Sequence, residues 1–156
     1  MELREICAAA LSVLLCLSAS AIGSLFIFPS IPGWYADLNK PFFTPPNWVF
    51  GPVWIILYIL MGIAAYLVFA KGTKGVWDAL TMFVIQLVLN VLWSILFFGA
   101  HWPLLSLVCI VALLCAIVLT IKRFYLISKA AAYLLSPYLL WVSFAAMLNL
   151  FVWMLN

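Results

Sequence analysis

Two amides and two aromatic side chains recur at helical spacing within one uncharged stretch of this sequence. They occupy positions i, i+4, i+7 and i+11, which share one face of a helix: Gln86, Asn90, Trp93 and Phe97. The stretch is apolar enough to lie in a membrane, and amides that face lipid at that depth are costly. The face is therefore expected to point inward, where its amides either line a ligand site or hold helices together.

Two other stretches repeat this pattern with aromatic side chains. Trp54 and Tyr58 lie four residues apart and share a face. A further stripe is formed by Pro137, Trp141 and Ala145, with Asn149 close to it. Pro137 lacks a backbone donor and is expected to kink its helix. Together the three faces predict an apolar, aromatic pocket with few polar groups, which suits a flat hydrophobic ligand.

These residue types restrict the chemistry available to such a pocket. No nucleophile–base pair or carboxylate dyad falls at membrane depth, and a lone histidine, His101, predicts no metal site. The four cysteines are interpreted as small hydrophobic side chains: Cys7, Cys16, Cys109 and Cys115. Neither catalytic residues nor an obligatory cofactor are therefore expected. Enzymatic chemistry would have to depend on light, oxygen and the indoles of Trp54 and Trp141, rather than on acid–base groups.

Composition places these residues in a membrane protein. Of the 156 residues, 70% are hydrophobic and only 7% are charged, whereas about a quarter of a soluble domain is charged. So few charges cannot cover a soluble surface, which excludes a soluble enzyme, a disordered regulator and a secreted disulfide scaffold. The net charge of +3 is too small and too scattered to predict a nucleic-acid partner. The lipid bilayer is the expected surroundings.

The uncharged runs predict five transmembrane helices. A spanning helix needs roughly 20 apolar residues, and runs of this length favour helices over alternating barrel strands. The expected helices cover residues 6–28, 47–70, 77–99, 103–122 and 130–154. Residues 1–156 are thus predicted to form one all-α membrane domain, a five-helix bundle. Ala19-Ser20-Ala21 resembles a signal-peptidase site, but the apolar run continues to Phe28 and is too long for a signal peptide.

Basic residues predict the orientation of this bundle. With five helices, one side of the membrane receives six of them: Arg4, Lys71, Lys74, Lys122, Arg123 and Lys129. The other side has Lys40 alone. The positive-inside rule therefore places the N-terminus in the cytoplasm and the C-terminus outside. A C-terminal tag that proteases reach only from the cytoplasmic side would contradict this orientation.

One connection, residues 29–46, is much longer than the others. It holds five prolines, which restrict their own φ and that of the preceding residue, so the loop is expected to be ordered. Loops of this length are commonly lids or binding loops, and this one is interpreted as a lid over the pocket. The residues assigned to the lid are Trp34, Lys40, Pro41, Pro45, Pro46 and, just beyond the loop, Trp48. The alternative is an interfacial plug whose aromatic side chains lie among lipid headgroups.

The eight tryptophans divide into two groups. Five lie near expected helix ends, where an aromatic belt at the membrane surface explains them: Trp34, Trp48, Trp77, Trp102 and Trp153. The other three, Trp54, Trp93 and Trp141, lie deeper. They fall in the middle of the membrane or in the half beneath the long loop, so they indicate a site rather than a belt.

Small residues recur in the first two expected helices and permit close contact between helices. They are Ala8, Ser12, Ala19 and Gly23 in the first, and Gly62 and Ala65 in the second. The sequence leaves open whether that contact lies within one chain or between the two chains of a dimer.

Longer gapped motifs resemble those of a known family. Residues 34–48 read Trp-Tyr-x-x-Leu-x-Lys-Pro-x-x-x-Pro-Pro-x-Trp, and Pro52-x-Trp54-x-x-x-Tyr58 continues them. The stretches 86–99 and 137–149 carry further motifs. All of them resemble the motifs of the translocator protein / tryptophan-rich sensory protein family (TspO/MBR), in the same order and over all five expected helices.

The resemblance implies a five-helix bundle, often a homodimer, that binds porphyrins such as protoporphyrin IX and similar flat hydrophobic molecules. It implies a binding or sensory role first, with light- and oxygen-dependent porphyrin degradation and transport of porphyrin or lipid as alternatives. Trp54 and Trp141 match two tryptophans implicated in porphyrin breakdown. Other matches to positions in or near the ligand cavity are Tyr35, Asn90, Trp93, Tyr138, Ala145 and Asn149. With the helical faces above, the expected site also includes Tyr58, Gln86 and Phe97.

Three features bear on these alternatives. Transporters typically show inverted repeats and charges within the membrane, whereas five helices do not divide evenly and their cores carry no charged side chain, which disfavours ion-coupled transport. The cholesterol motif of animal members needs a tyrosine followed by a basic residue, and residues 149–156 have neither. These residues also lack the polar tail of animal members, so a microbial cell membrane is expected.

Overall fold

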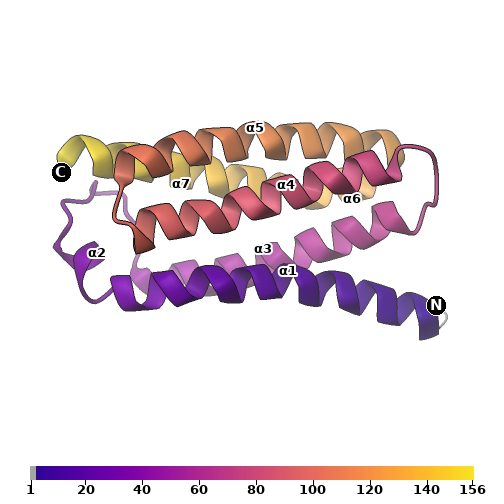
Figure 1. Cartoon of the computed structure of the whole chain (residues 1–156), viewed down its shortest axis with the longest axis horizontal. Helices are drawn as coiled ribbons and strands as arrows, with labels where there is room; N and C mark the ends of the chain where they lie inside the picture. The colour runs from indigo at the N-terminus through magenta and orange to yellow at the C-terminus, as the bar shows by residue number, and fades with distance from the viewer. Residues whose placement is uncertain (1–2) are drawn as a thin grey trace.

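The computed structural model describes residues 3–156, and these form five helical spans long enough to cross a membrane (Figure 1). The spans are α1 (Leu3–Ser30), α3 (Asn47–Phe69), α4 (Val76–Ser94) with the π-helical turn η1 (Ile95–Gly99), α5 (Pro103–Ile127), and α6 (Lys129–Leu134) followed by α7 (Ser136–Leu155). A short helix, α2 (Trp34–Asp37), lies in the long loop. The predicted all-α, five-helix architecture is confirmed, and the chain is an integral, multi-pass membrane protein.

The two ends of the bundle carry different connections. The long loop with α2, the turn between η1 and α5, and the C-terminus gather at one end, called the loop end below (Figure 1). The start of α1, the turn between α3 and α4, and the junction of α5 with α6 lie at the opposite end. All six basic residues that predicted the orientation lie at or near this opposite end. Which end faces the cytoplasm stays a prediction.

α1 is longer than expected. It continues through Pro29 to Ser30. Pro29 removes only one backbone donor, and the Ile31 amide still donates to the Ile27 carbonyl at 3.1 Å, so the last turn keeps its helical form. The loop therefore begins at Ile31 rather than at residue 29. Helix α2 makes part of this loop regular, in keeping with the prediction that the loop is ordered.

The last two spans also differ from their expected limits. α5 extends to Ile127, past the expected end at 122, because Lys122 and Arg123 can lie along the helix while their charged ends reach the membrane surface. The final span is interrupted at Leu135, two residues before Pro137, which has no N–H to continue the helical ladder. The kink expected at Pro137 is thus present as a break between α6 and α7.

α4 ends in a wide turn. In η1 the amide of Ala100 donates to the carbonyl of Ile95, five residues earlier, at 2.8 Å. Such a π turn adds a residue to the helical register. As a result two successive rings turn toward the interior: Phe97 is buried and Phe98 is half-buried. Both rings lie close to Trp93 one turn earlier, with centroids 5.8 and 6.0 Å from its own.

Close packing of α1 depends on glycines. A Cβ built on Gly62 of α3 would lie 2.5 Å from the Cα of Val13, so the two backbones touch where any side chain would collide. A Cβ on Gly23 of α1 would lie 3.3 Å from Ser94 Oγ on α4. These small residues therefore pack the helices of one chain together. Gly23 and Gly62 are thus used within one chain and do not indicate where a second chain would bind. The homodimer stays a prediction.

Substitution of two glycines on α3 should give opposite results. Gly62→Ala puts a methyl group into the α1 backbone, and overpacking of this kind costs about 1–3 kcal/mol. Gly51→Ala meets nothing within 4 Å and removes a poor helix former, so it should be neutral or stabilising by up to about 1 kcal/mol. Thermal unfolding of the purified variants in one detergent checks this. Equal unfolding midpoints for the two variants would contradict the packing argument.

Candidate functional site

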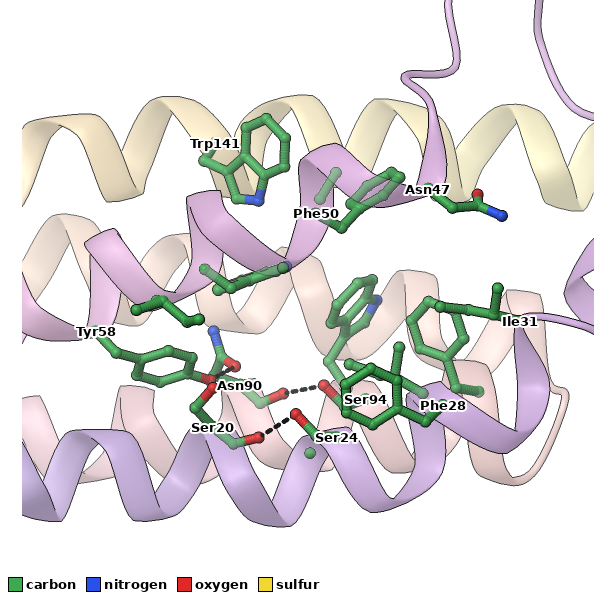
Figure 2. A pocket seen from close by; sticks show the side chains of 18 of the residues that line it. Ser20, Ser24, Phe28, Ile31, Asn47, Phe50, Tyr58, Asn90, Ser94 and Trp141 are labelled. Carbon is green, nitrogen blue, oxygen red and sulfur yellow. Dashed lines mark hydrogen bonds between the residues drawn. The ribbon is translucent and has the colours of Figure 1, made fainter.

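A cavity of about 150 Å³ lies between α1, α3, α4 and α7, on the side of the bundle nearer the loop end (Figure 2). Seven of the eleven predicted ligand-binding residues line it: Tyr35, Trp54, Tyr58, Asn90, Trp93, Trp141 and Ala145. The structure thus brings the three deep tryptophans around one cavity. The loop contributes to that space through Ile31 and Tyr35.

The other four predicted residues lie around this space rather than on its wall. Gln86 and Tyr138 continue a hydrogen-bond chain that leads from the cavity into the core. Phe97 and Asn149 line a smaller hollow next to Tyr35 and Trp93. Their contacts position the lining side chains.

The structure adds a wall that the sequence interpretation missed. The additional lining residues from α1 and the loop are Ser20, Gly23, Ser24, Ile27, Phe28 and Ile31. Those from α3, α4 and η1 are Asn47, Phe50, Gly51, Ile55, Ser94 and Phe98. One signal was present in the sequence, because Ser20 and Ser24 are four residues apart on an otherwise apolar helix and therefore share a face.

Four polar side chains form a hydrogen-bond chain that starts at the cavity. The Tyr58 hydroxyl donates to Asn90 Oδ1 at 2.7 Å, and Asn90 Nδ2 donates to the Tyr138 hydroxyl at 2.9 Å. The Tyr138 hydroxyl in turn donates to Gln86 Oε1 at 2.8 Å. Hydrocarbon would offer these groups no partner, so the chain fixes α3, α4 and α7 relative to one another.

A second set of hydrogen bonds holds Trp93. Its indole Nε1 donates to Asn149 Oδ1 at 3.0 Å. Asn149 Nδ2 donates to the carbonyl of Pro103 at 2.8 Å, and the Ser106 hydroxyl donates to Asn149 Oδ1 at 2.9 Å. Asn149 therefore connects α4, α5 and α7 and sets the orientation of the Trp93 ring beside the cavity.

The tryptophan rings form much of the cavity wall. The ring centroid of Trp54 lies 6.5 Å from that of Trp93 and 5.7 Å from that of Tyr58. The Trp141 ring lies 5.9 Å from that of Phe50. Rings at these separations are in contact. The wall therefore carries two groups of contacting rings, one around Trp54 and one around Trp141, on which a flat apolar molecule could stack.

Polar atoms on the wall offer both acceptors and a donor. The Ser24 hydroxyl donates to the Ser20 carbonyl at 2.9 Å, and the Ser94 hydroxyl donates to the Asn90 carbonyl at 3.3 Å (Figure 2). Both hydroxyls have thus used their protons and keep oxygen lone pairs as acceptors. The indole Nε1 of Trp141 is buried and finds no acceptor anywhere in residues 3–156. Because Nε1 is itself covered, a ligand acceptor could pair with it only after the Trp141 ring turns.

Within the long loop, Tyr35 is fixed by Lys40. Tyr35 is buried, and this burial raises the pKa of its phenol above the usual value. Lys40 Nζ donates to the carbonyl oxygen of Tyr35 at 2.6 Å and to that of Leu38 at 3.2 Å. The same Nζ lies 4.8 Å from the centroid of the Tyr35 ring. Lys40 thus neutralises the carbonyl end of α2 and holds Tyr35 over the cavity.

The other residues assigned to the lid lie away from the cavity. Trp34 stacks on His101, with ring centroids 4.4 Å apart. The prolines of residues 41–46 lead the chain into α3. Trp48 is 75% exposed, as expected for a ring at the membrane surface.

Removal of one hydroxyl from the buried chain should destabilise the fold. Tyr58→Phe leaves Asn90 Oδ1 without its donor in an apolar interior, which should cost about 0.5–2 kcal/mol. Tyr66→Phe removes a hydroxyl from the same helix, but this hydroxyl is not part of the hydrogen-bond chain, so the free energy of unfolding should change by less than about 0.5 kcal/mol. Unfolding of both variants by heat or denaturing detergent gives the comparison. The network would be energetically unimportant if the two variants unfolded alike.

Known proteins show the same sequence features over nearly the whole chain. Residues 12–154 match the TspO/MBR family. The chain is 48% identical over 145 residues to the tryptophan-rich protein TspO of Archaeoglobus fulgidus, which covers 93% of this chain and 94% of the relative. It is 45% identical over 155 residues to the protein of the same name from Chlorobaculum tepidum, with 98% of each covered. The translocator protein of Homo sapiens is 40% identical over 138 residues, with 85% of this chain and 80% of the relative covered. The chain therefore belongs to the TspO/MBR family.

Proposed function

We propose that this protein binds flat hydrophobic molecules inside the membrane, foremost porphyrins of the protoporphyrin IX type, and acts as a binding or sensory protein. The observation that carries the proposal is the cavity among Trp54, Trp93 and Trp141. Its wall combines contacting aromatic rings with few polar atoms. Sites of that kind suit planar apolar ligands, whose orientation is then fixed by the few polar groups.

The polar atoms of the wall narrow the class of ligand. Trp141 Nε1 needs an acceptor, whereas the hydroxyl oxygens of Ser24 and Ser94 can accept. A suitable ligand therefore carries at least one carbonyl or carboxylate together with N–H or O–H groups on an otherwise apolar, planar frame. A protoporphyrin carries propionic acid groups at its edge, whose oxygens accept and whose O–H groups donate when protonated, so it meets these requirements.

A macrocycle of that size requires the cavity to widen. Sites for drug-sized ligands typically measure about 300–1,000 Å³, whereas this cavity measures about 150 Å³. Two large side chains on its wall, Phe50 and Trp141, are only half-buried and have room to change rotamer. We therefore expect ligand binding to move these rings.

Protoporphyrin IX should bind saturably, and changes on the cavity wall should weaken it. Trp141→Phe removes the unpaired donor and Asn90→Ala interrupts the polar chain, so each should raise Kd roughly 5- to 30-fold. Trp153→Phe changes a tryptophan outside the cavity and should bind like the parent protein. Titration followed by the porphyrin absorption band gives Kd whichever tryptophan is replaced. Unchanged affinity in both cavity variants would exclude this cavity as the site.

The same tryptophans support a second candidate function, light- and oxygen-dependent porphyrin degradation. Trp54 and Trp141 both line the cavity, so their indoles would lie beside a bound macrocycle. A porphyrin excited by light can exchange electrons with an indole or pass its energy to oxygen, and neither step needs an acid–base residue. The enzyme function therefore depends on the ring contacts and not on a catalytic carboxylate or histidine.

Illumination in air separates degradation from binding alone. The parent protein with protoporphyrin IX should give one defined product, whereas the double variant Trp54→Phe/Trp141→Phe should bleach the porphyrin no faster than free tryptophan does. Mass spectrometry of the extracted pigment identifies the product. A binding protein without this activity would show the slow, unspecific bleaching in every sample.

A further inference from the structure

The cavity is open on one side, toward the membrane. Four of its lining residues are exposed, and they lie on α1 and α3: Phe28, Asn47, Gly51 and Ile55. Phe28 is 72% exposed and Ile55 is 51% exposed, although both contribute to the cavity wall. Figure 2 shows Ser24 and Phe28 of α1 on one side of the cavity and Phe50 of α3 on the other. We call this opening between α1 and α3 the lateral mouth.

Two glycines of α3 mark where the helices touch and where they part. At Gly62 the backbone of α3 touches α1, because a Cβ there would lie 2.5 Å from Val13 Cα. At Gly51 a Cβ would meet nothing within 4 Å. The two glycines are eleven residues apart, or about 16 Å along the helix. α1 and α3 are therefore packed tightly in one half of the bundle and separated in the half nearer the loop end.

The lateral mouth lies at the depth of lipid chains. Ile55 is eight residues from the start of α3, which is about 12 Å along the helix. The hydrocarbon core of a bilayer is about 30 Å thick, so this part of the mouth faces acyl chains rather than water. Its rim is formed largely by apolar groups, with the hydroxyl of Ser24 half-buried inside it. At the depth of Ile55 water has no favourable path, whereas a membrane-dissolved molecule does; Asn47, at the start of α3, forms the shallow, polar end of the mouth.

The loop end, in contrast, is closed by several contacts. The backbone N–H of Asn39 donates to Asn156 Oδ1 at 2.9 Å, and Asn156 Nδ2 donates to the backbone carbonyl of Asn39 at 3.0 Å. The Phe43 ring packs against that of Phe151, with centroids 5.4 Å apart. These contacts hold the loop against α7. A ligand arriving from water beneath the loop would have to break them.

We propose that the cavity takes its ligand sideways from the bilayer, through the lateral mouth, and that Gly51 keeps this passage open. The inference rests on the proposed binding function and adds its route and ligand class. The ligand is a planar amphiphile that dissolves in the membrane before it reaches the protein. The mouth also lets part of a macrocycle larger than the 150 Å³ cavity project between α1 and α3.

Progressive filling of the mouth tests this route. The variants Gly51→Ala, Gly51→Val and Gly51→Leu add increasing bulk where no neighbour lies within 4 Å, so the fold should tolerate them. Stopped-flow mixing of protoporphyrin IX with the variants in lipid nanodiscs gives the association rate constant. It should fall in the order of side-chain size, roughly tenfold for leucine, which corresponds to a modest added barrier.

A variant at the loop end provides the matched control. Asn156→Ala removes the side chain that accepts from the Asn39 backbone N–H at 2.9 Å and donates to the Asn39 carbonyl at 3.0 Å, and so loosens the loop end, yet it should leave the association rate constant within about twofold of the parent value. Faster association in Asn156→Ala, or parental rates in the alanine, valine and leucine variants of Gly51, would overturn the lateral route. If the leucine variant no longer binds, the rates of the alanine and valine variants decide. A parent protein that shows no saturable binding would instead contradict the proposed function.

Discussion

Hydrocarbon offers no hydrogen-bond partner, and the buried chain from Tyr58 to Gln86 is the consequence on which the rest of this structure depends. Two amides and two phenols hydrogen-bond to one another at membrane depth, and in doing so they join α3, α4 and α7. Asn149 of α7 joins α5 in the same way, through hydrogen bonds with Ser106 and with the carbonyl of Pro103. Four of the five spans are thus connected by directional bonds whose loss would leave polar atoms unpaired in lipid.

The same constraint explains why an aromatic cavity can exist there. Once directional bonds fix the helices, the rings of Trp54 and Trp93 need not fill every space between them. Three buried polar side-chain atoms remain unpaired within the described chain, Ser30 Oγ, Gln86 Nε2 and Trp141 Nε1, and a group of this kind costs about 1–3 kcal/mol. Ser30 and Gln86 lie off the cavity, whereas the Trp141 ring lines it. Because Trp141 Nε1 is itself covered, a ligand could pair with it only after the ring turns.

The sequence predicted the helices that are joined by hydrogen bonds better than it predicted the opening of the cavity between α1 and α3. The inward face of α4 followed from amides at helical spacing, because the cost of a polar group in lipid leaves one orientation. The wall formed by α1 was missed, since serine hydroxyls bond to their own helix and hardly alter an apolar run. Gly51 and Gly62 show the limit most clearly. They are the same residue type on one helix, and only the position of α1 makes one a contact and the other an opening.

α1 differs from the other spans in what holds it. Its contacts with α3 and α4 rely on the absence of side chains at Gly62 and Gly23, and its Ser24 hydroxyl bonds within its own helix. Between two apolar helices in lipid there is little hydrophobic driving force, because lipid tails replace the lost contacts. Moving α1 away from the cavity would therefore replace helix–helix contacts with helix–lipid contacts. Moving α4 from α7 would instead break hydrogen bonds that nothing in the membrane replaces. The cavity lies on the boundary between these two kinds of contact, so it can enlarge on one side without loss of the polar chain that defines the other.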